Sequence, residues 1–150
     1  LSDIGADAIK IGMLHSSDVV NLVADKIEQY NIRNVVLDPV MVSTSGHRLI
    51  EESAINTLID RLLPLSRIIT PNIPEAEILS GVKIESEENF DKVALQLSNN
   101  RSISVFLKAG HLSGELLVDY FYNAELDEII KLESKRVKTK NTHGTGCTLS

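Results

Sequence analysis

Residues 8–27 read AIKIGMLHSSDVVNLVADKI and contain the two patterns that decide the fold. The first six of these residues, Ala8 to Met13, form a short apolar run that is typical of a buried strand. Ser16 or Ser17, together with Asp18, can cap a following helix. The apolar face expected for this helix consists of Val19, Val20, Leu22, Val23 and Ile27. A strand followed directly by an amphipathic helix indicates the α/β class.

The same alternation continues along the chain. Further strands are predicted at Asn34 to Leu37, Arg67 to Thr70 and Ile103 to Leu107. Between them we expect a helix that Pro64 closes, a helix from Pro74 to Ser80, and a helix that Glu85 to Glu88 introduce. The first of these helices contains Leu58, Ile59, Leu62 and Leu63, and the last carries Phe90, Val93, Ala94 and Leu97 on one face. Two β-rich segments then follow without a helix between them, Leu116 to Tyr122 and Glu128 to Val137. We therefore expect a mostly parallel sheet flanked by helices, with an antiparallel hairpin near the C-terminal end. No linker or repeat interrupts residues 1–150, so one domain is expected.

Composition narrows the class of partner. The chain has a formal net charge of −6 and no basic cluster, which argues against a nucleic-acid surface. No stretch approaches the roughly 20 apolar residues that span a bilayer, so no membrane partner is expected. The single cysteine, Cys147, cannot form an internal disulfide, which favours a reducing compartment and predicts a cytoplasmic protein. A small molecule is the expected partner.

The segment Asn141 to Leu149 reads NTHGTGCTL and is suited to binding an anion beside a thiol. Gly144 and Gly146 allow backbone N–H groups to face a ligand, and the apolar step after Cys147 predicts that a helix begins there. The positive end of a helix favours both a phosphate and a thiolate. The segment lacks the Gly-Lys-Ser/Thr ending of a P-loop, which excludes that type of nucleotide site.

Polar residues follow the predicted strands, where ligands bind in open α/β sheets. Asp38 can hold a hydrated Mg²⁺ or cap a turn, and Lys108 can reach a nucleotide phosphate or remain a solvated strand-end lysine. Asn72 and Glu75 lie one turn apart at a helix start, where they can face an ion or phosphate, or only complement the helix dipole. Met13 and Met41 can contact an aromatic ring or fill the core.

As a set, these blocks resemble the hydroxymethylpyrimidine/phosphomethylpyrimidine kinases of the ribokinase-like superfamily. The blocks that carry the resemblance are Lys10 to Leu14, Asp38 to Met41, Thr70 to Ala76, Lys108 to His111 and Lys140 to Ser150. The resemblance implies a phosphotransferase of thiamine biosynthesis that uses ATP and Mg²⁺. Its substrates would be 4-amino-5-hydroxymethyl-2-methylpyrimidine and then the monophosphate of that pyrimidine. It also implies a homodimer for the full-length protein.

The resemblance assigns roles to individual residues. It implies that Asp38 and Glu75 lie at the metal, that Lys108, Asn72 and Thr142 lie near the nucleotide, and that Gly12, Met13 and Met41 lie near the pyrimidine. Gly144, Thr145, Gly146 and Cys147 would form the anion hole. Cys147 would accept the hydroxymethyl proton, because sugar-kinase relatives carry an aspartate base at this position.

Two other functions remain open at this point. One is a pyridoxal kinase on the same scaffold, because pyridoxal also offers a hydroxymethyl acceptor. The other is a non-catalytic pyrimidine-binding module. The family's N-terminal strand block and C-terminal helices have no counterpart in the sequence, so the resemblance implies a partial kinase domain, incomplete at both ends, that would not turn over alone. The loop at 42–46 also lacks a lysine that many relatives carry.

Overall fold

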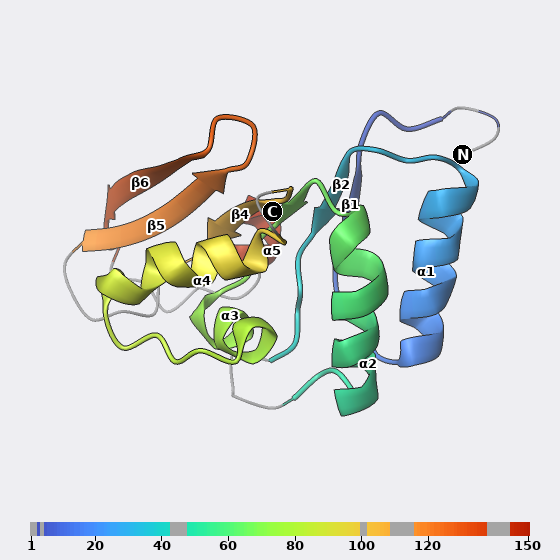
Figure 1. The fold of residues 1–150 in the computed structure, drawn as a ribbon, viewed down its shortest axis with the longest axis horizontal. Coiled ribbons are helices and arrows are strands. Elements are labelled where there is room, and N and C mark those ends of the chain that lie inside the picture. Colours follow the sequence, from blue (N-terminus) through green and yellow to red (C-terminus); the bar gives the residue numbers. More distant parts are fainter. Residues whose placement is uncertain (1–2, 4, 43–47, 100–101, 109–115, 138–144) are drawn as a thin grey trace.

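The computed structural model describes residues 3, 5–42, 48–99, 102–108, 116–137 and 145–150. Among these residues, six strands form one sheet in the order β1-β2-β3-β4-β5-β6 (Figure 1). The strands are β1 (Ile9–Ile11), β2 (Val35–Leu37), β3 (Ile68–Ile69), β4 (Ser104–Leu107), β5 (Leu116–Asn123) and β6 (Glu128–Lys135). The first four are parallel, and β5 and β6 continue the sheet as an antiparallel hairpin. The predicted sheet is therefore confirmed, with a shorter first strand than expected.

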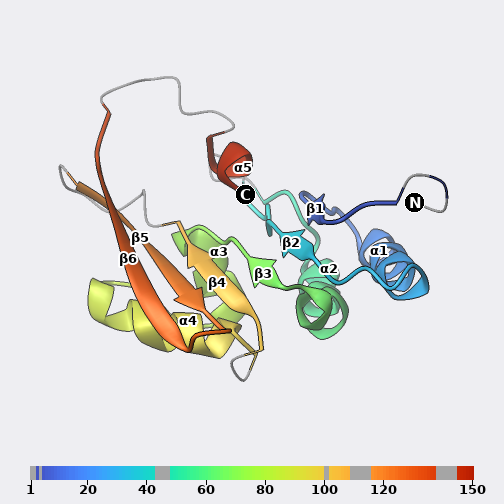
Figure 2. The same ribbon diagram turned by 90° about the horizontal axis from the view of Figure 1, so that it is seen from above.

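The helices connect successive parallel strands. They are α1 (Ser17–Gln29), α2 (Glu52–Thr57), α3 (Ile73–Ser80) and α4 (Phe90–Leu97), and α5 (Thr145–Leu149) follows the hairpin. A π-helical turn at Leu58–Leu62 and a 3-10 turn at Leu63–Leu65 extend α2, and another 3-10 turn at Glu87–Asn89 precedes α4. Seen from above, α1, α2 and α4 lie on one side of the sheet and α5 lies on the other (Figure 2). No helix among the described residues is long and apolar enough to cross a lipid bilayer.

The main core lies between the sheet and its helices. Val35, Leu37 and Ile69 are almost completely buried on this face of the sheet. The residues that α1 buries are Val20, Ala24 and Ile27, whereas Val19 and Leu22 are 41% and 57% exposed. The apolar face expected for this helix was therefore too broad, because a helix facing a sheet buries only the positions three or four residues apart along one stripe.

The other face of the sheet carries the polar residues of interest. Side chains alternate between the two faces of a strand, so Lys10 shares a face with its β2 partner Val36 and with Asp38. Thr70 and Lys108 follow β3 and β4 on this same face. Asp38, Thr70 and Lys108 each come directly after the last residue of their strand. The carboxyl end of the sheet therefore collects charged and hydroxyl groups beneath α5.

Candidate functional site

Asp38 lies at the centre of a cluster of polar side chains from four parallel strands. Its side chain is 2% exposed, and its Oδ1 accepts a 2.9 Å hydrogen bond from Lys108 Nζ. Lys10 Nζ lies 3.3 Å from the other oxygen, Oδ2. The Thr70 hydroxyl donates to Oδ1 over 3.4 Å. The structure thus brings Asp38 and Lys108 together as predicted, and it adds Lys10 and Thr70, to which the sequence assigned no role.

The charges of the cluster favour an anionic ligand. Burial raises the pKa of Asp38, but the hydrogen bonds and positive charges of Lys108, and then of Lys10, outweigh burial and hold this pKa below its usual value. Asp38 is therefore ionised at neutral pH and pairs with two lysines. Lysine side chains at this edge of the sheet suit a phosphate ligand. Within the described residues, Oδ2 is buried and accepts no hydrogen bond with good geometry, and its contact with Lys10 is an ion pair.

Asn72 and Glu75 cap the start of α3. The Asn72 side chain accepts a hydrogen bond from the Glu75 backbone N–H at 3.0 Å, and Glu75 Oε2 accepts one from the Asn72 N–H at 2.9 Å. Glu75 Oε1 accepts a third bond, from the Met41 N–H at 3.3 Å. This reciprocal arrangement is a capping box, which satisfies helix N–H groups that have no partner within the helix.

Glu75 is buried, and both its oxygens are engaged by the backbone. Burial is the largest influence on the pKa of Glu75 and raises it, and the charge of Asp38 acts in the same direction. The backbone hydrogen bonds from Asn72 and Met41 and the charge of Lys108 lower this pKa, but they do not outweigh burial. The pKa of Glu75 is therefore above its ordinary value. The structure therefore gives Glu75 a structural role at the helix start and beside the Asp38 cluster. Its role as a metal ligand stays a prediction.

The two methionines lie in different surroundings. Met13 follows β1 and is 59% exposed, and a Cβ at the neighbouring Gly12 would meet no heavy atom within 4 Å. The space beside Gly12 and Met13 is therefore open to a ligand. Met41 is 0% exposed, so the structure does not bring its side chain to the predicted substrate site. The Met41 side chain belongs to the hydrophobic core, and the Met41 N–H donates a hydrogen bond to the Glu75 carboxylate.

The thiol of Cys147 is exposed on α5. This helix starts at Thr145, two residues before the predicted start, so Gly146 and Cys147 lie inside it. The Cys147 carbonyl accepts a hydrogen bond of 2.5 Å from Lys10 Nζ, which connects α5 to the Asp38 cluster. Thr142 and Gly144 lie outside the described residues, so their predicted roles stay predictions.

Two of the cavities that the described residues form bear on the position of the site. One of about 260 Å³ separates α5 from the sheet next to the Asp38 cluster, and its lining consists of Val36, Ile68, Thr70, Phe106, Leu149 and Ser150. A larger one, of about 360 Å³, lies beside Asn34, which precedes β2 at the opposite, amino end of the strands. Because ligands of open α/β sheets bind at the carboxyl ends of strands, we place the functional site at the Asp38 cluster and not at the larger cavity.

The alternation of side chains along a strand was the signal that could have found Lys10 and Thr70. Both share a sheet face with Asp38 when strand positions are counted in steps of two. The contact between Lys10 and Cys147 could not be found in this way, because it joins residues 137 positions apart.

Comparison with known proteins relates the chain to small-molecule kinases by family profile, by sequence identity and by structure. The profile of the phosphomethylpyrimidine kinase family matches residues 1–150. The hydroxymethylpyrimidine/phosphomethylpyrimidine kinase of Escherichia coli K12 is 42% identical over 150 residues, which are 99% of this chain and 56% of that protein. The ADP complex of Bacillus subtilis pyridoxal kinase matches with a TM-score of 0.85 and 34% identity, over 98% of this chain and 54% of that one. Phosphomethylpyrimidine kinase from Clostridium difficile 630 matches with a TM-score of 0.77 and 37% identity, over 89% and 56% of the two chains.

The chain thus spans about half the length of these relatives. The likeness to the solved kinases confirms the predicted ribokinase-like fold, with a mixed sheet and flanking helices. The match over every residue confirms the resemblance drawn from the five sequence blocks. On these grounds the chain belongs to the phosphomethylpyrimidine kinase family.

Proposed function

We propose that the full-length protein transfers a phosphoryl group from ATP to 4-amino-5-hydroxymethyl-2-methylpyrimidine, and then a second one to the resulting monophosphate, as a step in thiamine biosynthesis. The observation that carries the proposal is the cluster of Lys10, Asp38 and Lys108 at the carboxyl end of the sheet, in a chain that the family profile matches from end to end. Phosphoryl transfer depends mainly on positioning and on neutralising phosphate charge, and this cluster offers both.

The residues present fit a Mg²⁺ ion that is held largely by water and by the phosphates of ATP. Asp38 offers a buried oxygen, Oδ2, whose contact among the described residues is an ion pair with Lys10. These residues include no group of three or more His, Cys, Asp or Glu side chains that could enclose an ion by themselves. Mg²⁺ commonly takes one or two carboxylates together with water and substrate phosphates, so one Asp38 oxygen is a sufficient protein contribution. When bound, Mg²⁺ would neutralise charge on the phosphate oxygens.

Lys108 and Cys147 would then act on the two sides of the transferred group. The Lys108 ammonium is 12% exposed and would hold a phosphate oxygen as a point charge, while Asp38 fixes its position. Cys147 would take the proton of the hydroxymethyl group as the alkoxide oxygen forms its bond to phosphorus and ADP leaves. The monophosphate is already an anion, so the second transfer needs little proton removal, and one site can serve both steps.

The test is a product assay on the full-length protein with ATP and Mg²⁺. The expected products from hydroxymethylpyrimidine are the monophosphate and then the pyrophosphate, which chromatography separates. Absence of both would overturn the proposal. A cytoplasmic location and a homodimer are part of the same proposal, and fractionation and light scattering test them separately.

A pyridoxal kinase activity is the second candidate, and the TM-score of 0.85 to Bacillus subtilis pyridoxal kinase favours it. The higher identity to the phosphomethylpyrimidine kinases favours the first candidate. Parallel assays with pyridoxal and hydroxymethylpyrimidine, compared by kcat/KM, separate the two. Calorimetry addresses the non-catalytic alternative, which requires that the pyrimidine binds while no ATP is consumed.

A further inference from the structure

Lys10 contacts two parts of the site that are far apart in the sequence. Its Nζ lies 3.3 Å from Asp38 Oδ2 and donates a 2.5 Å hydrogen bond to the carbonyl of Cys147. These contacts join the middle of β1 to the end of β2 and to α5. We propose that Lys10 is a positioning residue that holds α5 at Cys147, and with it the Cys147 thiol, at a fixed place relative to Asp38.

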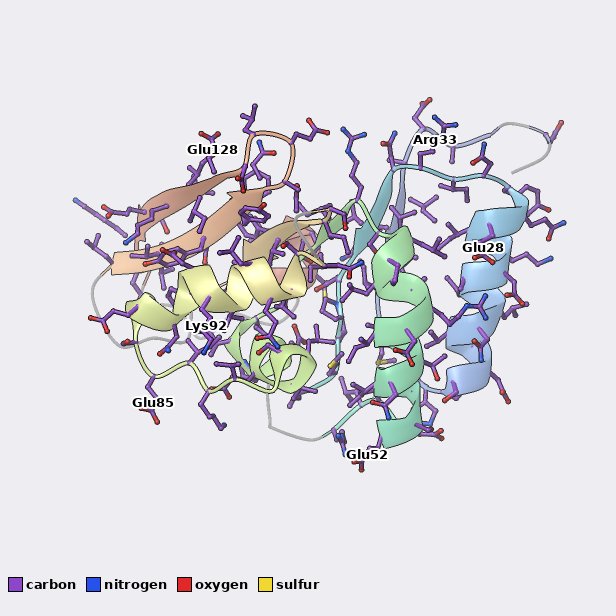
Figure 3. The ribbon with its side chains drawn as sticks, viewed as in Figure 1. Glu28, Arg33, Glu52, Glu85, Lys92 and Glu128 are labelled. Carbon is purple, nitrogen blue, oxygen red and sulfur yellow. The ribbon has the colours of Figure 1, made fainter. Side chains whose placement is uncertain are left out.

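The surroundings of Lys10 favour this role over that of an ordinary surface lysine. Its side chain is only 33% exposed, although it stands on the sheet face that α1, α2 and α4 do not cover. Glu128 points away from the molecule in Figure 3, as expected of a solvated charge. Lys10 instead forms an ion pair with the Asp38 carboxylate and donates a hydrogen bond to the Cys147 backbone carbonyl.

The hydrogen bond from Lys10 joins two elements that are far apart in the sequence. Lys10 and Cys147 are 137 positions apart, so the bond connects β1 directly to α5. A charged hydrogen bond is stronger than a neutral one, so this bond is a firm attachment between α5 and the Asp38 cluster.

The catalytic consequence rests on the proposed function. The thiol can serve as a base only if it stands within hydrogen-bond distance of the hydroxymethyl group while the phosphates are held near Asp38 and Lys108. Lys10 connects the two halves of this arrangement without itself needing to contact substrate. Loss of Lys10 should therefore lower kcat for the first phosphorylation by about 10- to 100-fold, the scale expected for a slightly misplaced catalytic group, and change KM for the pyrimidine far less.

The first test compares Lys10→Met, Lys10→Arg and the control Lys92→Met in the full-length protein. Lys92 is an exposed lysine on α4, which lies on the opposite side of the sheet from α5 (Figure 2). We expect a loss of kcat in Lys10→Met, partial recovery in Lys10→Arg because the guanidinium keeps the charge and the donors, and wild-type kinetics in Lys92→Met. A rise in KM at unchanged kcat, or no recovery with arginine, would overturn the proposal.

A second measurement does not depend on activity. Hydrogen exchange of the ligand-free protein, read on the peptide that contains residues 145–150, should be faster in Lys10→Met than in the wild type and in Lys92→Met. Unchanged exchange would contradict the attachment of α5 by Lys10. Faster exchange in a protein that phosphorylates no pyrimidine would instead retain the attachment and refute the proposed function.

A double-mutant cycle with Cys147→Ala tests whether Lys10 acts through the thiol. The Lys10→Met change should cost much less in kcat when Cys147 is already alanine, because the group that Lys10 positions is then absent. Equal losses in both backgrounds would mean that Lys10 acts independently of the thiol, and the positioning role would be refuted.

Discussion

Lys108 and Asp38 form an ion pair across an intervening strand. Lys108 Nζ lies 2.9 Å from Asp38 Oδ1, although β3 separates the strands that carry the two residues. Their side chains are 12% and 2% exposed, so the pair is largely shielded from water. The pair therefore depends on the alignment of three strands, and removing either charge should affect both stability and activity.

The Asp38→Asn variant should lose stability at neutral pH. The change removes the carboxylate that pairs with Lys108 and Lys10, which should cost toward the lower end of the roughly 3–5 kcal/mol expected for breaking a buried pair, since both lysines retain some contact with water. Urea unfolding measures this difference, with Lys92→Met as a control for the loss of an exposed charge.

The pH dependence of this difference has a defined sign. The pKa of Asp38 is lowered in the folded state, so the stability due to its charge is fully present above about pH 4, the ordinary value for a carboxyl group, and is lost as the pH falls through the lowered folded value. The stability gap between the wild type and Asp38→Asn should therefore narrow below pH 4. A gap that widens there would be inconsistent with a lowered pKa.

The Glu75→Gln variant should be destabilised by about 1–3 kcal/mol, the cost of leaving a buried donor unpaired. Glu75 accepts backbone hydrogen bonds at both oxygens, whereas glutamine offers only one acceptor. The matched control is Glu85→Gln, because Glu85 is exposed and points away from the molecule (Figure 3). Thermal unfolding should give a lower midpoint temperature for Glu75→Gln than for Glu85→Gln. Equal midpoints in the two variants would argue against the capping role of Glu75.

Much of the fold could be predicted because its signals are local. The parallel strands appear as short apolar runs, Pro74 and Gly81 mark the ends of α3, and the hairpin follows from two β-rich segments without a helix between them. Other features depend on contacts that sequence spacing does not encode. The π-helical turn at Leu58–Leu62 follows α2 without any distinctive pattern, and only packing of α1 against the sheet decides that Val19 stays exposed.

The methionines give a contrasting pair of predictions. The Met41→Ala change should cost about 2–5 kcal/mol in unfolding free energy, because it opens a cavity in the core. The Met13→Ala change should alter stability by less than about 0.5 kcal/mol, as is usual at an exposed position, yet raise KM for the pyrimidine. Chemical denaturation and steady-state kinetics of both variants are the required measurements. An unchanged KM in Met13→Ala would remove Met13 from the substrate site.

The contact between Phe90 and Tyr120 should be important for joining α4 to the hairpin. Their ring centroids lie 4.3 Å apart, and both side chains are almost completely buried. The Phe90→Ala change should therefore cost about 3–5 kcal/mol. Leu95→Ala on the same helix is the control, because Leu95 is 36% exposed and should cost far less. Similar losses in the two variants would contradict this account of the core.

Part of the candidate site could also be predicted from the sequence, because the order of strands places certain residues at the edge of the sheet. Asp38 and Lys108 were identified because strand ends of a parallel sheet meet at one edge, and the structure places them in direct contact. Met41 was also near a strand end, but its side chain is buried in the core. Position along the chain thus predicts which residues lie near the edge of the sheet, whereas tertiary packing determines which of their side chains are buried.

The most direct test of the central claim is the initial rate of the full-length wild type and Cys147→Ala on two acceptors, hydroxymethylpyrimidine and its monophosphate. If Cys147 is the base of a phosphoryl-transfer site, the variant should lose about 100-fold or more on the hydroxymethyl acceptor and much less on the monophosphate, which needs little proton removal. Nucleotide binding, measured by calorimetry, should be unchanged. Wild-type rates on hydroxymethylpyrimidine, or equal losses on both acceptors, would contradict the account.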